Sequence, residues 1–256
     1  MVHSAIHQAQ VCSAGAIETY PASLAKLIQS LQGVVYLTPP QIKALISKAA
    51  ISQQELMPWA DFTHPARDSY GRNLVFRGKH FEVMVMTWLP GDFSAIHDHG
   101  AARWGAVQCF GVAKHYVYTF EQCCLHRLVA ANLFPGAIHA FNHSLVDQMG
   151  NSSDRTFLSL HVYGCDTITE SITSDARVFD LLEGSIQHTN GDAFFCLPEG
   201  KINKRLYGVK GDKKTTLLQH RLMRDRLETA LASRRDYALM KKRQRLKARV
   251  QRMGCL

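Results

Sequence analysis

The centre of the chain, from about residue 72 to residue 200, consists of short runs rich in β-branched and aromatic residues. NLVF, HFEVMVMTW, GAVQCFGVAKHYVYTF, TFLSLHVY and DAFFCLP are examples, and Gly, Pro, Asn and Asp separate them. Runs of this length with turn residues between them are typical of strands joined by short connections. They predict a mainly β domain, either an antiparallel sandwich or a small barrel. With 256 residues, the chain can build one such domain with a large core and further segments.

Helical patterns flank this region on both sides. Before it, residues 22–33 and 38–58 repeat apolar side chains at helical spacing, and Thr38 followed by two prolines is a good helix start. After Asp212 neither Gly nor Pro occurs until Gly254, which predicts one or two amphipathic helices. We therefore expect an N-terminal helical segment packed on the barrel (1–60), a β-domain (61–205) and a helical C-terminal extension (206–256).

The positive charge of the chain is concentrated in the C-terminal extension. The whole sequence has a formal net charge of +9, yet residues 213–256 alone hold 14 Lys and Arg against three acidic residues. Clustered cations attract phosphates without regard to sequence, so nucleic acid or another polyanion is one candidate partner. The alternative is a solvated helix whose apolar stripe packs on the barrel or on a second subunit.

Three observations suggest the cellular setting. No apolar run reaches the roughly 18 residues that a membrane-spanning helix needs. The first 20 residues lack the basic and apolar parts of a secretory signal. The seven cysteines are scattered and form no CxxC pair, which favours reduced thiols. We expect a cytoplasmic protein without a membrane span.

The stretch AIHDHG contains the most specific chemical signal. On a strand, His97 and His99 point to the same face, where two imidazoles can share one cation. A stable metal site needs another ligand, and FPGAIHAFNH offers His139 at the start of the next strand after a Pro–Gly turn. The spacing alone does not show that the three side chains meet.

These residues also carry a family resemblance. GDFSAIHDHGAARWGAVQCFG resembles the first motif of the cupins, and PGAIH resembles the second. YGRNLVFRGKHFEVMVMTWLPGDFSAIHDHG together with LSLHVYG is similar to cysteine dioxygenase, a thiol dioxygenase of the cupin superfamily. The likeness runs from Trp59 to Gly184, and its strength lies in the order and distances of the motifs.

The resemblance implies a cupin barrel that holds a single Fe(II) ion on His97, His99 and His139. The usual cupin glutamate would fall at Trp104, so that position offers no carboxylate. Three neutral imidazoles would leave the full charge on the metal, and a thiol bound to it would lose its proton. The substrate would be a small thiol together with O2.

The resemblance also implies roles for residues around the metal. Arg72 matches the arginine that binds the substrate carboxylate, and Tyr70 shares its face of the strand. Ser159, His161 and Tyr163 match a relay in which the tyrosine hydroxyl reaches the metal-bound groups. The activity implied is oxidation of L-cysteine to cysteine sulfinate.

Trp104 departs from the family pattern. Animal enzymes have a cysteine there that crosslinks to the tyrosine, and many bacterial ones have a glycine. A thioether between residues 104 and 163 is therefore impossible. An inward indole would fill part of the pocket, whereas an outward one would leave it unchanged.

Three other functions are consistent with the sequence. The enzyme could oxidise another small thiol such as 3-mercaptopropionate. Three histidines also suit zinc or nickel, as in a hydrolase or isomerase. The third is a non-enzymatic metal-binding cupin whose basic tail binds nucleic acid.

Overall fold

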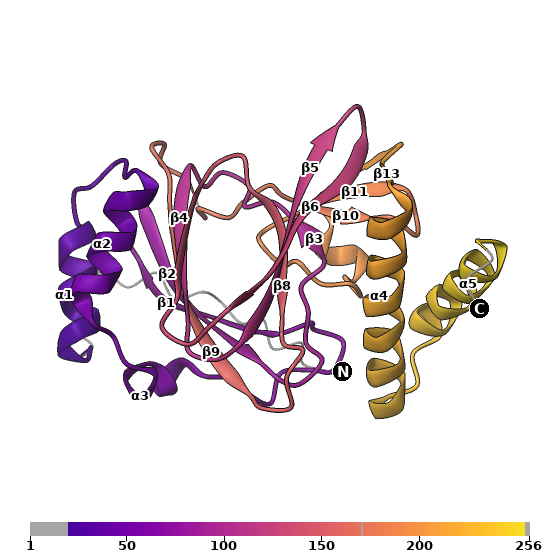
Figure 1. Ribbon diagram of the computed structural model, residues 1–256, viewed down its shortest axis with the longest axis horizontal. Coiled ribbons are helices and arrows are strands. Elements are labelled where there is room, and N and C mark those ends of the chain that lie inside the picture. Colours follow the sequence, from indigo (N-terminus) through magenta and orange to yellow (C-terminus); the bar gives the residue numbers. More distant parts are fainter. Residues whose placement is uncertain (1–19, 170, 254–256) are drawn as a thin grey trace, which may run out of the picture.

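The computed structural model describes residues 20–169 and 171–253, and within these ranges the β-rich centre forms two sheets (Figure 1). The first described sheet has, in spatial order, the strands β1 (Gly71–Arg77), β2 (Phe81–Trp88), β9 (Phe157–Gly164), β4 (Trp104–Cys109) and β7 (Ile138–Asn142). The second has β12 (Lys204–Tyr207), β11 (Ser185–Thr189), β10 (Ala176–Asp180), β3 (Ile96–His97), β8 (Val146–Gly150), β5 (Ala113–Glu121), β6 (Cys124–Leu133) and β13 (Lys210–Gly211). Neighbouring strands are antiparallel except β13 with β6. The predicted mainly β, antiparallel fold is confirmed.

Side-chain alternation divides the first sheet into an outer and an inner face. On β9, Leu158, Leu160 and Val162 belong to an apolar core that they share with the N-terminal helices. The residues between them, Ser159, His161 and Tyr163, point the other way, toward the second sheet. The inner face of this strand therefore carries polar side chains while its outer face is wholly apolar.

Short N-terminal helices cover the outer face of the first sheet (Figure 1). They are α1 (Ala22–Leu31), α2 (Pro39–Ala49), α3 (Gln53–Leu56) and the 3-10 turn η1 (Met57–Trp59). Thr38 and Gln41 form a capping box at the start of α2, which agrees with the sequence signal there. The apolar stripes of α1 and α2 pack against β2, β4 and β9 and exclude water from the outer face of the sheet.

Two long helices pack beside the second sheet, α4 (Lys213–Ser233) and α5 (Tyr237–Arg252), after the 3-10 turn η2 (Glu199–Lys201). The side chains of Asp212 and Asp236 each accept a hydrogen bond from a backbone N–H in the first turn of the helix that follows. Residues 234–236 connect the two helices. Met223 and Leu246 join the core that contains Ile96 of β3. None of the helices in the described residues has the length and apolar character needed to cross a bilayer.

A buried cation and a largely buried one join the C-terminal helices to the barrel. Arg226 of α4 pairs with Asp92, and the Lys242 Nζ of α5 lies 2.8 Å from an oxygen of Asp180. Burial alone would raise the pKa of Asp180, but the Lys242 ammonium outweighs it and holds that pKa below its ordinary value. Breaking one partner of such a pair leaves an uncompensated buried charge, so the contacts fix how the helices dock.

The cysteines in the described residues form no disulfide: Cys109, Cys123, Cys124, Cys165 and Cys196 are free thiols. Cys109 lies inside the barrel, where burial raises its pKa to about 12. Cys12 and Cys255 lie outside the described residues.

Candidate metal centre and substrate cavity

The candidate metal centre forms where β8 lies between β3 and β5. In the β3–β8 pair, Asp147 is directly opposite His97, and on the other side it is opposite Val117 of β5. His99 follows His97 by two residues, so an extended backbone directs both rings to the same side. The pairing register thus brings a carboxylate to the two imidazoles of the HDH motif.

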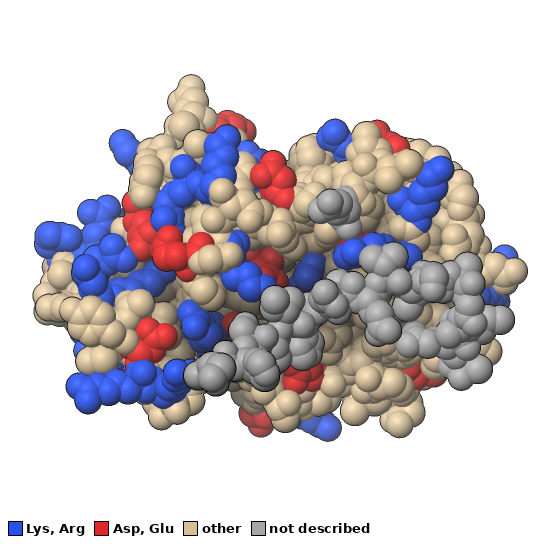
Figure 2. All heavy atoms as spheres, turned by 180° about the vertical axis from the view of Figure 1, so that it is seen from behind, with Lys and Arg blue, Asp and Glu red and all other residues tan. Residues whose placement is uncertain are grey.

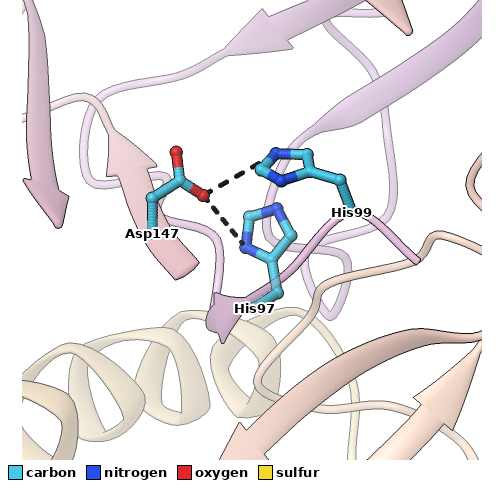
Figure 3. A group of neighbouring side chains, drawn as sticks. All are labelled: His97, His99 and Asp147. Carbon is cyan, nitrogen blue, oxygen red and sulfur yellow. Dashed lines mark ion pairs between the residues drawn. The ribbon is translucent and has the colours of Figure 1, made fainter. Parts of the chain in front are cut away.

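Metal-binding side chains are those of His, Cys, Asp and Glu. Among the described residues, His97, His99 and Asp147 form a group of three whose possible ligand atoms all lie within 4.8 Å of one another (Figure 3). The Oδ1 of Asp147 is 3.9 Å from His97 Nδ1 and 3.8 Å from His99 Nε2. This oxygen is buried and has no hydrogen-bond partner among the described residues. An unpaired buried carboxylate oxygen between two imidazoles could take a metal ion as its missing partner.

The protonation states of these groups suit a cation. Burial lowers the pKa of His99 to about 4, so its ring is neutral near pH 7. Burial would raise the pKa of Asp147, but the hydrogen bond that it accepts from His115 lowers it, and the net pKa lies well below the ordinary value. The centre therefore presents an ionised carboxylate and a neutral imidazole that retains a lone pair for a metal.

His115 on β5 supports the carboxylate from behind. Its Nε2 lies 2.8 Å from the second oxygen of Asp147, and because a carboxylate only accepts, this nitrogen donates its N–H. His115 is 3% exposed. A hydrogen bond from a buried imidazole fixes the rotation of the carboxylate and leaves Oδ1 directed at His97 and His99.

His139, the third ligand expected from the sequence, is not a member of this group of donors. It lies on β7 opposite Val107 of β4, in the first sheet, and its ring packs against the ring of His115 with centroids 4.8 Å apart. Two residues further along the same face, Phe141 reaches the His99 ring at 4.4 Å. An advance of two residues along a strand is about 6.6 Å, so Phe141 packs on the His99 ring while His139, one such step earlier, packs on the His115 ring.

Ser159, His161 and Tyr163 form a continuous hydrogen-bonded row on the inner face of β9. The Ser159 hydroxyl is 2.8 Å from His161 Nε2, and His161 Nδ1 is 2.9 Å from the Tyr163 hydroxyl. The Tyr163 ring lies 5.5 Å from the His99 ring between centroids. The structure thus brings these three residues together and ends the row beside the candidate metal centre.

Trp88 sets the direction of this row. Its indole N–H donates to the Ser159 hydroxyl at 2.8 Å, and an indole can only donate. Among the described residues, His161 Nε2 is then the acceptor within reach of the Ser159 hydroxyl hydrogen. Burial lowers the pKa of His161 to about 3, so the ring is neutral and carries its hydrogen on Nδ1. That N–H donates to the Tyr163 oxygen, which leaves the Tyr163 hydroxyl hydrogen free to donate into the cavity.

One small cavity joins the residues expected to bind substrate to those expected to bind metal. Arg72, Tyr70, His97, His99 and Tyr163 all line it. The Nη2 of Arg72 donates to the Thr173 hydroxyl at 2.9 Å, while its Nε is buried and has no hydrogen-bond partner in the part of the chain that the structure describes. With Nη2 held by Thr173 and Nε not hydrogen-bonded, the guanidinium keeps an N–H donor for a carboxylate.

Tyr70 is held by contacts on three sides. Its ring stacks on Trp88 at 4.8 Å between centroids and meets the edge of Phe194 at 5.0 Å. Its hydroxyl oxygen accepts the N–H of Ala193 at 3.3 Å. Tyr70 therefore forms a rigid wall of the cavity next to Arg72.

Gly191 makes room for the Arg72 guanidinium. It has φ +99°, and an added Cβ would lie 2.4 Å from the Thr173 hydroxyl and 2.7 Å from the Arg72 Nη2. Any side chain at this position would be strained by the backbone and would displace the arginine. The close approach of this backbone fixes the width of the cavity.

Trp104 lies outside the cavity. It is on the outer face of β4, fully buried in the core under the N-terminal helices, and its indole N–H donates to the Val35 carbonyl at 3.3 Å. Gly105, its neighbour, is directly opposite Tyr163 and faces inward. Alternation along β4 therefore turns the large side chain away from the cavity, and the residue beside Tyr163 is a glycine.

The comparison with protein families assigns the chain. The family model described as cysteine dioxygenase type I matches residues 15–169, which is more than half of the sequence. The chain belongs to this family. Cysteine dioxygenase family members are thiol dioxygenases of the cupin superfamily and hence oxidoreductases, and the resemblance expected from the motifs is confirmed. The match ends before α4 and α5, so it leaves the C-terminal helices undescribed.

Solved structures similar to this family member include several cupins, at low identity. A protein from Thermus thermophilus is 18% identical, with 43% of this chain and 93% of that one covered and a TM-score of 0.35. A protein with a double-stranded β-helix domain from Klebsiella pneumoniae is 16% identical over 48% of this chain and 90% of that one, with a TM-score of 0.36. A cupin domain from Bordetella pertussis is 16% identical over 38% and 95%, with a TM-score of 0.32. The family match and the two observed sheets, and not these weak likenesses, identify the fold as a cupin, as expected.

Sequence reasoning did not find Asp147, His115, Trp88 or Thr173. A usable signal existed for Asp147, because an ionisable residue that is depleted in strands occurs within the strand-like run LVDQMG. All five residues of β8 are buried, so that carboxylate needs a partner inside the protein. His115, Trp88 and Thr173 act through tertiary contacts, which no local sequence pattern indicates.

Proposed function

We propose that this chain is a mononuclear non-haem iron(II) thiol dioxygenase that converts L-cysteine and O2 to cysteine sulfinate. The observation that carries the proposal is the shared cavity. It places an arginine with an unpaired N–H, a tyrosine with a free hydroxyl hydrogen and two members of a His–His–Asp group around one small space. In the overall reaction the sulfur is oxidised, O2 is reduced, and both oxygen atoms end on sulfur.

The residues present fit an iron(II) ion. Two imidazoles and one carboxylate are the donor set of many non-haem iron oxygenases, and the unpaired buried oxygen of Asp147 faces both imidazoles. We propose His97, His99 and Asp147 as the ligands, with Asp147 in the role that the sequence had given to His139. Bound iron would supply Lewis acidity toward a thiol and redox chemistry toward dioxygen.

Replacing an imidazole by a carboxylate changes the charge of the centre. With Asp147 as a ligand, the ion and its ligands together carry one unit of positive charge less than with three histidines. The attraction for a thiolate is weaker, and Arg72 becomes more important because its guanidinium is the positive group available to the substrate carboxylate in the cavity. The Arg72 Nε supplies a hydrogen bond without giving up the existing one to Thr173.

Tyr163 acts at the other side of the cavity. Burial raises the pKa of its phenol above the ordinary value, so the hydroxyl stays protonated at neutral pH. His161 donates to its oxygen, and the Tyr163 O–H then donates to the negative charge that develops on the reacting groups. The row from Trp88 through Ser159 holds the imidazole in the tautomer that this requires.

The nearest alternative within this chemistry is a different small thiol acid, such as 3-mercaptopropionate. Arg72 favours a substrate with a carboxylate and argues against cysteamine, which has none. Assays of cysteine, 3-mercaptopropionate and cysteamine side by side therefore test the cavity directly. We expect turnover in the order cysteine, 3-mercaptopropionate, cysteamine.

The experiment that tests the proposal is anaerobic loading of the full chain with iron(II), followed by cysteine and O2 and by mass spectrometry of the product. We expect a product heavier by two oxygen atoms, both of which come from labelled O2. Asp147→Ala is expected to abolish iron retention, and Arg72→Ala is expected to raise KM while iron remains bound.

Matched controls are available on an exposed loop. Asp154→Ala and Arg155→Ala remove the same chemical groups away from the cavity and should leave iron content and KM unchanged. A protein that retains zinc but not iron, or that holds iron without consuming O2 in the presence of any of the three thiols, would overturn the proposal.

A further inference from the structure

A groove of about 380 Å³ lies between α4 and α5, outside the part of the chain that the family model matches. Its apolar lining is aliphatic and comes from Leu217 of α4 and from Leu246 and Val250 of α5. This volume is within the range of about 300–1,000 Å³ that small-molecule sites commonly have. The groove is thus large enough for a small ligand and offers it an apolar surface.

Four cationic side chains surround this aliphatic lining: Arg221, Arg224, Arg243 and Lys247. Arg224 pairs with Asp225 and Arg243 pairs with Glu228, both at the surface. Arg221 and Lys247 are exposed and pair with no acidic residue in the described part of the chain. Lys and Arg gather over this end of the molecule, at the left of Figure 2. The rim of the groove therefore carries uncompensated positive charge.

His220 adds an independent observation in the wall of the groove. It is 1% exposed, and although the Leu181 backbone lies close to the ring, neither ring nitrogen makes a hydrogen bond of ordinary geometry with any described residue. A buried imidazole without partners is costly and uncommon in native proteins. An anionic group bound in the groove would bring an acceptor toward this ring.

We propose that the groove between α4 and α5 binds a small amphipathic anion, a carboxylate at the end of an unbranched alkyl chain. The alkyl chain lies along Leu217, Leu246 and Val250, and the carboxylate is held by Arg221 and Lys247. Burial of the methylene groups supplies affinity, and the guanidinium and ammonium select the charged end. This site is separate from the metal centre and does not depend on the proposed reaction.

The lining argues against nucleic acid as the occupant. None of the described residues that line the groove is Phe, Tyr or Trp, so bases have no ring there to stack on. Polyanion binding to the basic helices would depend on total charge and not on the aliphatic lining. Binding of a small amphipathic anion should weaken only when cations of the groove are removed. Binding of a polyanion should weaken equally when cations outside the groove are removed.

The test is titration of the full chain with decanoate, followed by calorimetry and by the shift in Tm. We expect saturable binding of decanoate, no binding of acetate, which lacks the alkyl chain, and no binding of decyltrimethylammonium, which reverses the charge. In the double variant Arg221→Gln/Lys247→Gln the Kd for decanoate should rise by about tenfold or more. Binding should persist in Arg72→Ala, because the substrate cavity is not involved.

A charge-matched control lies on the same two helices. Lys214→Gln/Lys241→Gln removes two exposed cations outside the groove and should leave the Kd within about twofold, the size of a screened surface effect. An equal loss in both double variants, or tighter binding of a 20-nucleotide RNA that both variants weaken alike, would show diffuse polyanion attraction. Equal binding of decyltrimethylammonium would show a merely apolar surface. Each of these results overturns the proposal.

Discussion

Strand β9 supplies Tyr163 to the cavity and β8 supplies Asp147 to the candidate metal centre, yet the two regions differ in how directly the sequence reveals their roles. β9 is one uninterrupted strand, so Ser159, His161 and Tyr163 share a face by simple alternation. β7 and β8 belong to different sheets and are joined by a turn. Which of their side chains faces the metal centre depends on the register of each strand with its own neighbours.

The difference shows that a sequence motif predicts which side chains face a site only where the backbone that carries it is a regular, uninterrupted element. His139 follows a Pro–Gly turn in the position where a ligand would be sought, but its strand pairs with β4 in the first sheet. Asp147, eight residues later, pairs with His97 itself. Two questions can be tested. The first is whether the pairing of β8 with β3 builds the metal centre, and the second is whether the hydrogen bonds along β9 all run in one direction, from Trp88 to Tyr163.

The largest expected effect separates Asp147 from His139. Asp147→Ala should lose iron and reduce kcat/KM by more than about 100-fold, beyond what loss of an outer hydrogen-bond partner costs. His139→Ala should retain iron, because its ring contacts His115 and not the group of donors. Iron content by metal analysis checks both variants, and Asp147→His, which restores a donor atom, should recover part of the iron. Loss of iron in His139→Ala with retention in Asp147→Ala would reverse the assignment.

Tyr163→Phe is expected to lower kcat by about 100-fold, the lower range for loss of a positioned proton donor. Iron content and KM should change little, since the ring that packs beside His99 is retained. Steady-state oxygen consumption measures the effect, and Tyr207→Phe, on an exposed tyrosine, is the control. An unchanged kcat would mean that the hydroxyl does not act on the reacting groups.

His115→Phe should weaken iron affinity by about tenfold through loss of the hydrogen bond that orients the Asp147 carboxylate. Competition with a chelator of known affinity measures this change. His126→Phe removes a half-exposed imidazole that lies on β6, away from the centre, and should leave the affinity unaltered. If His115→Phe binds iron as the parent does, then strand pairing alone orients the carboxylate.

Trp88→Phe is expected to produce the smallest effect, a decrease in kcat of about fivefold, because one neutral hydrogen bond contributes about 1 kcal/mol. The variant keeps an aromatic ring against Tyr70 but removes the indole N–H that gives the row its direction. Ser159→Ala should reproduce the decrease, and the double variant should be no worse than either single one. Additive losses would show that the two residues do not act in sequence on His161.

Much of the fold could be predicted from sequence, for identifiable reasons. The helical spacing of Leu24, Leu27, Ile28 and Leu31 corresponds to α1, and the strand-like runs correspond to the two sheets. The pairs that the chain keeps close together, His97 with His99 and Arg72 with Tyr70, line the expected cavity. Each of these depends on periodicity over a few consecutive residues, which the sequence displays directly.

The sequence by itself determined the class of fold and, through the order and spacing of its motifs, the family. It also determined which residues share a face within single strands, because side-chain alternation is a local property of the backbone. Only the tertiary structure decided that Asp147 lies opposite His97, that Trp104 faces the helices and that Trp88 directs the row on β9. These depend on which strands become neighbours and in what register, and register is set by the packing of the whole core.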